Sequence, residues 1–176
     1  FIAQIKVRFE NLVVGDPRES GTQVGPQVTK AQAMKTLNYI EIAKKDGGKV
    51  IASAKVPVNV NLASGFFVPP TAFIDLPTSS AAVQEEIFGP VLSIATFKDE
   101  ADAISKAHDS DFGLAAGVWT DKGSRIFNLT SKLRAGVIWA NCYNKFDPTS
   151  PFGGYKESGF GREGGLHGLS AYLKLS

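Results

Sequence analysis

The sequence predicts an α/β fold, an open and mostly parallel sheet flanked by helices. The first observation is the second half of the chain, where β-rich runs at 91–97, 114–119 and 137–140 alternate with helical patterns. The second is that Asp99 and Thr120, which are of types that favour helix N-termini, precede those helical patterns. Strands that alternate with helices predict parallel pairing through right-handed crossovers, so we expect the three strands in one sheet.

The first half of the chain predicts two helices. Residues 1–14 carry apolar side chains at helical spacing, and Gly15-Asp16-Pro17 ends that pattern. Thr29 and Gln32 form a capping-box pattern before a second helix, which Gly47-Gly48 closes. The apolar stripe expected on this second helix consists of Val28, Ala31, Met34, Leu37, Ile40 and Ala43.

Two irregular stretches follow that helix. Residues 52–64 predict a polar loop. Residues 66–76 look extended, but Pro69 and Pro70 confine them to a sheet edge or an irregular segment, because proline cannot donate a ladder hydrogen bond.

Composition excludes several classes of protein. The chain has 176 residues, 43% of them hydrophobic and 20% charged, which is typical of one globular domain, 1–176. The net charge of +2 comes without a long basic run, so we expect no nucleic-acid partner. A single cysteine leaves no disulfide framework and no cysteine-based metal cluster. No apolar run approaches about 20 residues, so we expect no membrane partner and a cytoplasmic location.

The segment from 141 to 165 is the candidate site by position. It follows the last predicted strand and is rich in glycine and aromatic residues. Ligands of open α/β sheets bind outside the carboxyl ends of the strands. The alternative is a long ordered loop that only covers the sheet.

Three motifs have a structural alternative. Residues 159–164 match G-x-G-x-x-G, but they follow a loop and only 12 residues remain, so tight turns are the better interpretation. Cys142 ends an apolar strand without an evident histidine partner, which favours a buried and inert cysteine over a nucleophile. Glu85 and Glu86 precede an apolar run, so one of them is either solvated surface or an inward carboxylate suited to a sugar diol.

Several stretches taken together resemble the aldehyde dehydrogenase superfamily. They are GDP at 15–17, GP at 25–26, PT at 70–71, EEIFGPV at 85–91, GLAAGVWT at 113–120, AGVIWAN at 135–141, PFGGYKESG at 151–159 and GRE at 161–163. The resemblance covers essentially the whole chain but only about the last third of a family member. We therefore expect the C-terminal portion of a catalytic domain.

The resemblance implies NAD(P)-dependent oxidation of an aldehyde to a carboxylic acid through a cysteine thiohemiacetal. The nucleophilic cysteine, the general-base glutamate, the oxyanion asparagine and the Rossmann domain of the family all match positions before Phe1. No catalytic residue is therefore expected in this chain, no metal ligand either, and no cofactor is expected to bind the isolated chain. The parent enzyme would use NAD or NADP and form a homo-oligomer.

The resemblance also implies roles for five residues. Glu86 is similar to the residue that binds the nicotinamide-side ribose hydroxyls, and Phe88 to one that packs by the nicotinamide ring. Phe146 and Phe152 match positions that line the aldehyde tunnel. Glu163 matches a glutamate of a proton relay, although its lysine partner is missing.

Some features depart from the family pattern. The loop at 52–64 lacks a glycine pair that is common there, and Lys145 places a charge near the expected tunnel mouth. The chain begins without methionine, so we expect a trimmed start or a fragment of a longer chain. The alternatives are a truncated, non-catalytic relative that acts as a binding or assembly module, and an unrelated α/β binding module. The aldehyde and the choice between NAD and NADP stay open.

Overall fold

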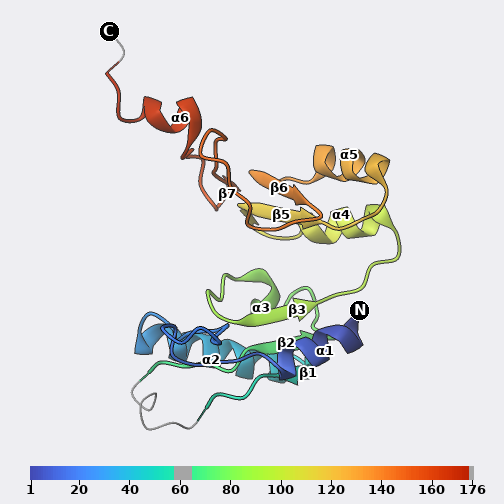
Figure 1. Cartoon of the computed structure of the whole chain (residues 1–176). Helices are drawn as coiled ribbons and strands as arrows, with labels where there is room; N and C mark the ends of the chain where they lie inside the picture. The colour runs from blue at the N-terminus through green and yellow to red at the C-terminus, as the bar shows by residue number, and fades with distance from the viewer. Residues whose placement is uncertain (58–64, 175–176) are drawn as a thin grey trace. The chain divides into compact units, whose positions relative to one another are not determined.

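The computed structural model describes residues 1–57 and 65–174, and these residues form two compact units. Unit 1 is Phe1–Thr96 and unit 2 is Phe97–Ser176. Unit 1 contains α1 (Ile2–Glu10), α2 (Lys30–Lys45), β1 (Lys49–Ser53), β2 (Thr71–Ile74), α3 (Ala81–Gln84) and β3 (Val91–Ile94) (Figure 1). Unit 2 contains α4 (Glu100–His108), β4 (Phe112–Gly113), β5 (Ala115–Val118), α5 (Gly123–Lys132), β6 (Val137–Ala140), β7 (Tyr155–Lys156) and α6 (Gly165–Ser170).

Unit 1 is built on a three-stranded sheet in the order β1-β2-β3. β2 pairs antiparallel with β1 and parallel with β3, with Thr71 opposite Val91 and Ile74 opposite Ile94. The prediction that the prolines confine this segment to an edge or an irregular stretch was wrong for β2, which is the central strand. Pro69 and Pro70 precede the strand, so every residue of β2 keeps its backbone N–H for the ladder.

Helix α2 begins where the sequence predicts. The side chain of Thr29 accepts a hydrogen bond from the backbone N–H of Gln32 at 3.1 Å, which confirms the N-cap. The buried face, however, is Ala33, Thr36, Tyr39, Ile40 and Ala43. Only Ile40 and Ala43 of the predicted stripe are fully buried, because the polar Thr36 and Tyr39 also enter the interior with their hydroxyls hydrogen-bonded.

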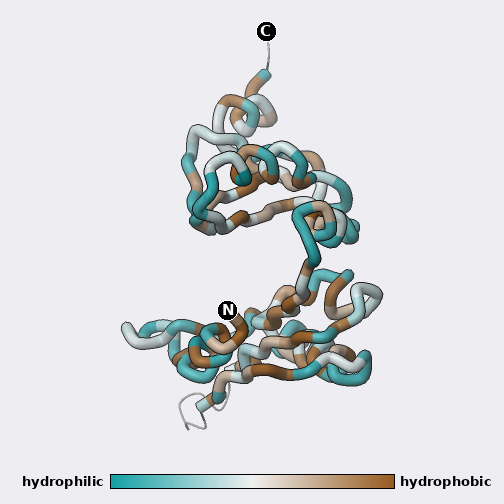
Figure 2. The backbone as a smooth tube through the Cα atoms, turned by 90° about the vertical axis from the view of Figure 1, so that its right-hand side faces the viewer, coloured by the Kyte–Doolittle hydropathy of each residue, from teal (hydrophilic) through white to brown (hydrophobic). Residues whose placement is uncertain are grey.

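The core of unit 1 forms where α2 packs against β2. Phe73 of β2 and Ala43 of α2 are both completely buried, and Val68, Ala82 and Ile87 complete the same cluster. Figure 2 shows hydrophobic stretches along the strands and hydrophilic residues in the connecting turns. The segment that carries Glu86 and Phe88 is therefore attached to this core through Ile87.

Unit 2 contains the βαβ element that the sequence predicts. β5 and β6 pair parallel, from Ala115 opposite Val137 to Val118 opposite Ala140, with α5 between them. Asp99 caps α4, since its side chain accepts from the N–H of Asp102 at 2.9 Å. Thr120 does not cap α5: it accepts from Lys122 N, and the helix starts later, at Gly123. The Thr120 hydroxyl therefore stabilises the turn between β5 and α5 and not the first turn of the helix.

The three predicted strands do not share one sheet. β3 pairs with β2, whereas β5 and β6 form a separate two-stranded sheet. The reason is that β3 pairs with β2. The sequence did not indicate β2 as a strand that can pair on both edges. The α/β class is confirmed, with parallel and antiparallel pairs. The assignment of 1–176 to one domain stays a prediction.

Two predictions concern the stretch after α2. Residues 49–53 form β1, so the first residues of the predicted loop at 52–64 belong to a strand. The glycine pair was expected within the loop at 52–64, and residues 58–64 of that loop lie outside the described part of the chain.

Among residues 1–57 and 65–174, no helix has the length and apolar character to cross a bilayer.

Candidate functional site

Residues 86–88 of unit 1 are held to helix α2 through three consecutive backbone carbonyls. The side-chain amide of Gln32 donates to the carbonyls of Ile87 and Phe88, each at 2.9 Å. The ammonium of Lys35 donates to the carbonyl of Glu86, also at 2.9 Å. The side chain of Gln32 therefore does not return to Thr29 as a capping box requires, because it bonds the loop instead.

The same face of α2 also contacts the residues on either side of these carbonyls. Gln32, Thr36 and Tyr39 are four and three residues apart in turn, which places them on one side of a helix. A Cβ on Gly89 would collide with the Thr36 side chain, and Thr36 is completely buried. Glycine is therefore required at 89 for the loop to lie this close to α2.

The side chain of Glu85 is bonded by α2, whereas Glu86 is bonded by α2 only through its backbone carbonyl. The Tyr39 hydroxyl donates to a carboxylate oxygen of Glu85. This bond, followed by burial of the phenol and by the charge of Glu85, raises the pKa of Tyr39 above its ordinary value. The Glu86 side chain is exposed, and it has no hydrogen bond or ion pair with residues 1–57 or 65–174. Both acids are exposed, but the Glu85 carboxylate already accepts from Tyr39, whereas the Glu86 carboxylate keeps all its acceptor sites open to a ligand.

Phe88 has a backbone conformation that a bulky residue rarely adopts. Its φ is +59°, and its side chain is 73% exposed. Such a conformation persists where surrounding interactions determine it, and it is most common at functional positions. Here Gln32 holds the Phe88 carbonyl and Gly89 closes onto Thr36. The segment therefore presents a carboxylate and an aromatic ring outward from a fixed backbone.

These two groups are chemically suited to a sugar diol and to a planar ring. A carboxylate without a protein partner can accept from both hydroxyls of a ribose, and charge-assisted bonds of this kind are the stronger ones. An exposed ring on a fixed backbone offers a flat apolar surface to a planar heterocycle.

Unit 2 carries a row of five aromatic side chains, one in β6 and four in the segments that follow its parallel strands. We call Trp119, Tyr143, Trp139, Phe146 and Phe152 the aromatic row. Successive rings are 6.2, 4.7, 5.4 and 5.0 Å apart between centroids, and the Phe146 and Phe152 rings are perpendicular. The indole N–H of Trp139 donates to the carbonyl of Lys145 at 2.7 Å, which ties the loop to β6. The row brings both predicted tunnel residues into one contact network.

Phe152 and Glu163 lie opposite each other in an isolated antiparallel bridge. Each backbone N–H donates to the other residue's carbonyl at 2.7 Å. The guanidinium of Arg162 reinforces the loop between them, because it donates to the carbonyls of residues 154, 160 and 161 and lies 5.1 Å from the Tyr155 ring centroid. The Glu163 side chain is exposed.

The glycine-rich segment that carries Phe152 is held by a lysine side chain and by glycine turns. The Lys156 ammonium donates to the carbonyls of His108 and Ser110, next to the C-terminal end of α4, at 3.0 and 2.6 Å. Gly159 and Gly164 have φ values of +87° and +72°, in agreement with the interpretation of these glycines as turn residues. The Lys156 bonds and the glycine turns therefore fix the glycine-rich segment, which carries Phe152 of the aromatic row.

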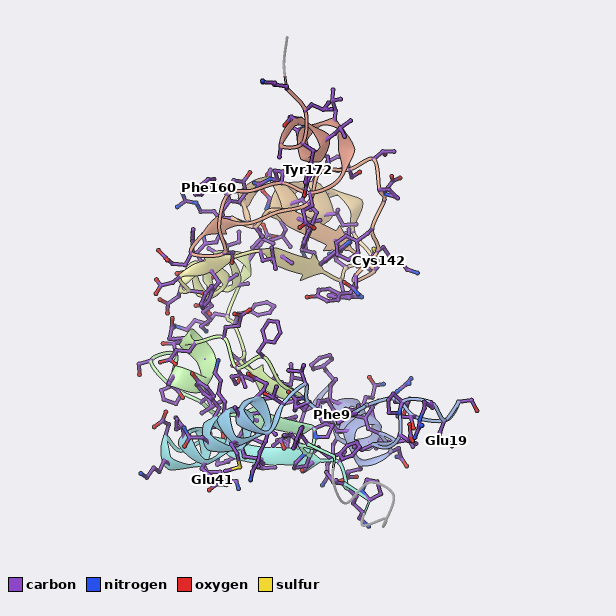
Figure 3. The ribbon with its side chains drawn as sticks, turned by 90° about the vertical axis from the view of Figure 1, so that its left-hand side faces the viewer. Phe9, Glu19, Glu41, Cys142, Phe160 and Tyr172 are labelled. Carbon is purple, nitrogen blue, oxygen red and sulfur yellow. The ribbon has the colours of Figure 1, made fainter. Side chains whose placement is uncertain are left out.

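Cys142 lies in the loop that follows β6 (Figure 3). It is a free cysteine and is partly exposed, so the expectation of a fully buried thiol was wrong. The chain turns out of the strand at Asn141, before Cys142, which removes that residue from the sheet.

Sequence reasoning missed Gln32, Lys35 and Tyr39 as residues of the site. They are polar side chains on one face of a predicted helix, and the sequence pattern assigns a role only to Gln32, as part of the capping box. The pairing of that face with residues 85–88, about 50 positions later in the chain, is decided by tertiary packing.

Comparison with known proteins identifies one family. The sequence model of the family described as "Aldehyde dehydrogenase family" matches residues 1–176. A betaine aldehyde dehydrogenase of Sinorhizobium fredii is 42% identical over 175 residues, which are 99% of this chain and 36% of the relative. That of Brucella melitensis is 41% identical over the same shares of the two chains.

Solved structures agree with this match. An aldehyde dehydrogenase of Mycobacterium tuberculosis complexed with NAD+ aligns with a TM-score of 0.90 at 37% identity, over 97% of this chain and 35% of that one. A betaine aldehyde dehydrogenase variant of Staphylococcus aureus in complex with NAD+ aligns with a TM-score of 0.92 at 34% identity, over 98% and 35%. The chain thus spans about a third of the length of the proteins that it matches.

Proposed function

Because the chain belongs to the aldehyde dehydrogenase family, we propose that residues 1–176 supply part of the cofactor site and part of the substrate site of an enzyme that oxidises an aldehyde to a carboxylic acid with NAD. The observation that carries this proposal is the segment from 85 to 89. Its backbone is held by α2, while Glu86 and Phe88 are left available to a ligand.

In this proposal Glu86 and Phe88 bind the nicotinamide half of NAD. The Glu86 carboxylate accepts hydrogen bonds from the two ribose hydroxyls, and the Phe88 ring restricts the poses of the nicotinamide. Bound NAD would supply the acceptor for the hydride that leaves the substrate. Gln32 and Lys35 are positioning residues, because they hold the carbonyls of residues 86–88 and leave the side chains free.

Phe146 and Phe152 form part of the wall of the aldehyde site. Their rings contact each other edge to face and offer apolar surface of the kind that lines substrate pockets. Glu163, which lies opposite Phe152, would take part in a proton relay. The reacting cysteine, its base and the remainder of the cofactor site would come from the part of the family fold that this chain does not match.

Two finer assignments belong to the same proposal. NAD, as opposed to NADP, is supported by the NAD+ complexes of the Mycobacterium tuberculosis and Staphylococcus aureus structures. A homo-oligomeric enzyme in the cytoplasm is the state that we expect, and the similarity to betaine aldehyde dehydrogenases makes betaine aldehyde a substrate to test first.

A chimera tests the proposal. Residues 1–176 replace the matching third of the Sinorhizobium fredii relative, and NAD-dependent oxidation of betaine aldehyde and acetaldehyde is measured against the unsubstituted relative. We expect the chimera to oxidise at least one aldehyde. A folded chimera that binds NAD but oxidises neither would count against the proposed function.

The matched pair Glu86→Gln and Glu85→Gln tests the assignment of the acid. Gln keeps the shape and one acceptor but loses charge-assisted bonds worth about 1.5–3 kcal/mol each, so Glu86→Gln should weaken NAD binding and slow hydride transfer about tenfold or more. Glu85→Gln should change both less than about threefold, since that side chain bonds Tyr39. The reverse order of the two variants would move the role to Glu85.

A further inference from the structure

The side chain of Asn141 joins the ends of the two parallel strands in unit 2. Its Oδ1 accepts a hydrogen bond from the backbone N–H of Thr120, and its Nδ2 donates to the carbonyl of Thr120, both at 2.9 Å. Its own backbone N–H donates to the carbonyl of Val118 at 2.8 Å. The primary amide therefore pairs with a peptide group as a further strand residue would, although Asn141 lies one position beyond the end of β6 and Thr120 two positions beyond the end of β5.

The backbone of Asn141 turns at the same point. Its φ is +53°, in the left-handed region that asparagine tolerates better than other side chains with a Cβ. Asparagine thus does two things here. It allows the chain to leave the strand sharply, and it fixes the departing loop to the neighbouring strand end.

The loop that starts at this turn carries Tyr143 and Phe146 of the aromatic row. Tyr143 packs on Trp139, which belongs to β6, and on Trp119, which follows β5. Thr120 directly follows Trp119, and Asn141 comes two residues after Trp139, so the amide pair lies next to both tryptophans in sequence. A Cβ on Gly117 would collide with Trp119, so the rings have little freedom toward the sheet.

We propose that Asn141 is a positioning residue that sets the spacing of Trp119, Tyr143 and Trp139 through its amide pair with Thr120, and so determines how well the site binds aromatic aldehydes relative to small ones. This inference rests on the proposed function, since it assumes that the aromatic row faces an aldehyde. The pair with Thr120 is made to backbone atoms, so it can be removed only at Asn141.

The chain offers a matched control for this pair. Asn144 lies in the same loop with a φ of +55°, and its side chain is exposed and makes no hydrogen bond within the described residues. Asn141→Gly and Asn144→Gly both place glycine at a left-handed position, but only the first removes an amide pair. Asn141→Asp is a second test variant, because it replaces the Nδ2 donor by an acceptor that faces the Thr120 carbonyl.

The isolated chain reports directly on the row, because its two tryptophans are Trp119 and Trp139. We expect Asn141→Gly to shift the tryptophan emission to longer wavelength and to weaken the near-ultraviolet circular dichroism. Asn144→Gly should leave both signals unchanged.

The chimera described above reports on specificity. In Asn141→Gly, we expect the ratio of the KM for benzaldehyde to the KM for acetaldehyde to rise about fivefold, the effect of weakening one or two ring contacts. The KM for NAD should stay within about twofold, which a general loss of structure would not produce. Asn144→Gly should leave the ratio unchanged.

The outcomes separate the inference from the function. An active Asn141→Gly chimera with an unchanged ratio overturns the inference alone, and so does an Asn144→Gly variant that matches it in emission and ratio. Absence of aldehyde oxidation in the unsubstituted chimera overturns the proposed function and the inference with it. If Asn141→Gly does not fold, Asn141→Asp is judged by the same ratio, and failure of both variants to fold contradicts a role confined to specificity.

Discussion

Glu85 and Glu86 are chemically identical neighbours that the fold treats differently. The Tyr39 hydroxyl binds Glu85, and Lys35 binds the backbone carbonyl of Glu86 while its carboxylate stays exposed. A buried phenol that donates to a carboxylate holds that carboxylate in one place. The selection between the two acids is therefore made by one residue of α2.

This contact predicts a dependence of stability on alkaline pH. The pKa of Tyr39 is raised first by its hydrogen bond to Glu85, then by burial and by the Glu85 charge. A raised pKa in the folded chain means that the folded state binds the proton more tightly. The resulting stability is fully present below about pH 10, the ordinary tyrosine pKa, and is lost as the pH rises through the higher folded value.

Urea unfolding at several pH values around and above 10 measures this effect. We expect the stability of the unsubstituted chain to fall more steeply there than that of Tyr39→Phe, which lacks the titrating group. Tyr172→Phe is the control, because that side chain is 87% exposed and should leave the steep fall in place. Equal slopes for the unsubstituted chain and Tyr39→Phe would contradict the assignment of the bond.

At the scale of elements, α2 is the support of the candidate cofactor segment. One face of this helix contributes to the core through Ala43 and Ile40, and its N-terminal half bonds the backbone of residues 86–88. Helix and loop are in direct contact at Gly89 and Thr36. A change in the loop should therefore be measurable as a change in the packing of the helix.

Gly89→Ala should destabilise the chain by about 1–3 kcal/mol, the usual cost of an added methyl group in a well-packed interior. The added Cβ would collide with Thr36, which has no room to move because it is completely buried. The midpoint of urea unfolding measures the loss. Gly21→Ala is the control, since a Cβ there meets no atom within 4 Å.

The double variant Gly89→Ala with Thr36→Ala tests the cause. If the collision with Thr36 is responsible, the two substitutions should be less destabilising together than the sum of the two alone. Additive losses would indicate that Gly89→Ala acts through the backbone of the loop and not through this contact.

At the scale of the whole molecule, the residues of the proposed cofactor site and those of the proposed aldehyde site belong to different units of the chain. Unit 1 contains Glu86 and Phe88, and unit 2 contains the aromatic row and Glu163. Within the described residues, the thiol of Cys142 makes no hydrogen bond to a base. The family match covers a third of the relatives' length, and the expected nucleophile and base fall in the other two thirds.

The isolated chain should therefore show no NAD-dependent oxidation of aldehydes. Removal of the key groups of a catalytic constellation lowers rates by several orders of magnitude. The absorbance of reduced cofactor, with acetaldehyde and betaine aldehyde at high protein concentration, is the measurement. Turnover that disappears in Cys142→Ser would overturn this prediction and would make Cys142 a nucleophile.

The sequence by itself determined the local elements and the family. Asp99 and Thr29 cap their helices as predicted, because a cap depends on residues only three positions apart. The strand from Val137 to Ala140 was predicted to the residue, since an apolar β-branched run between Gly136 and a polar loop has few alternatives. The blocks at 85–91 and 151–159 indicated the family that the comparison shows.

Tertiary structure alone decided which elements meet. It placed β2 at the centre of a sheet, and it paired β3 with β2 and β5 with β6. It also brought Tyr39 to Glu85, about 50 positions later in the chain. Such contacts depend on the free energy of packing surfaces that no short window of sequence contains. The same holds for Asn141, because an asparagine at a strand end becomes a link between two strand ends only when Thr120, which follows β5, lies beside it.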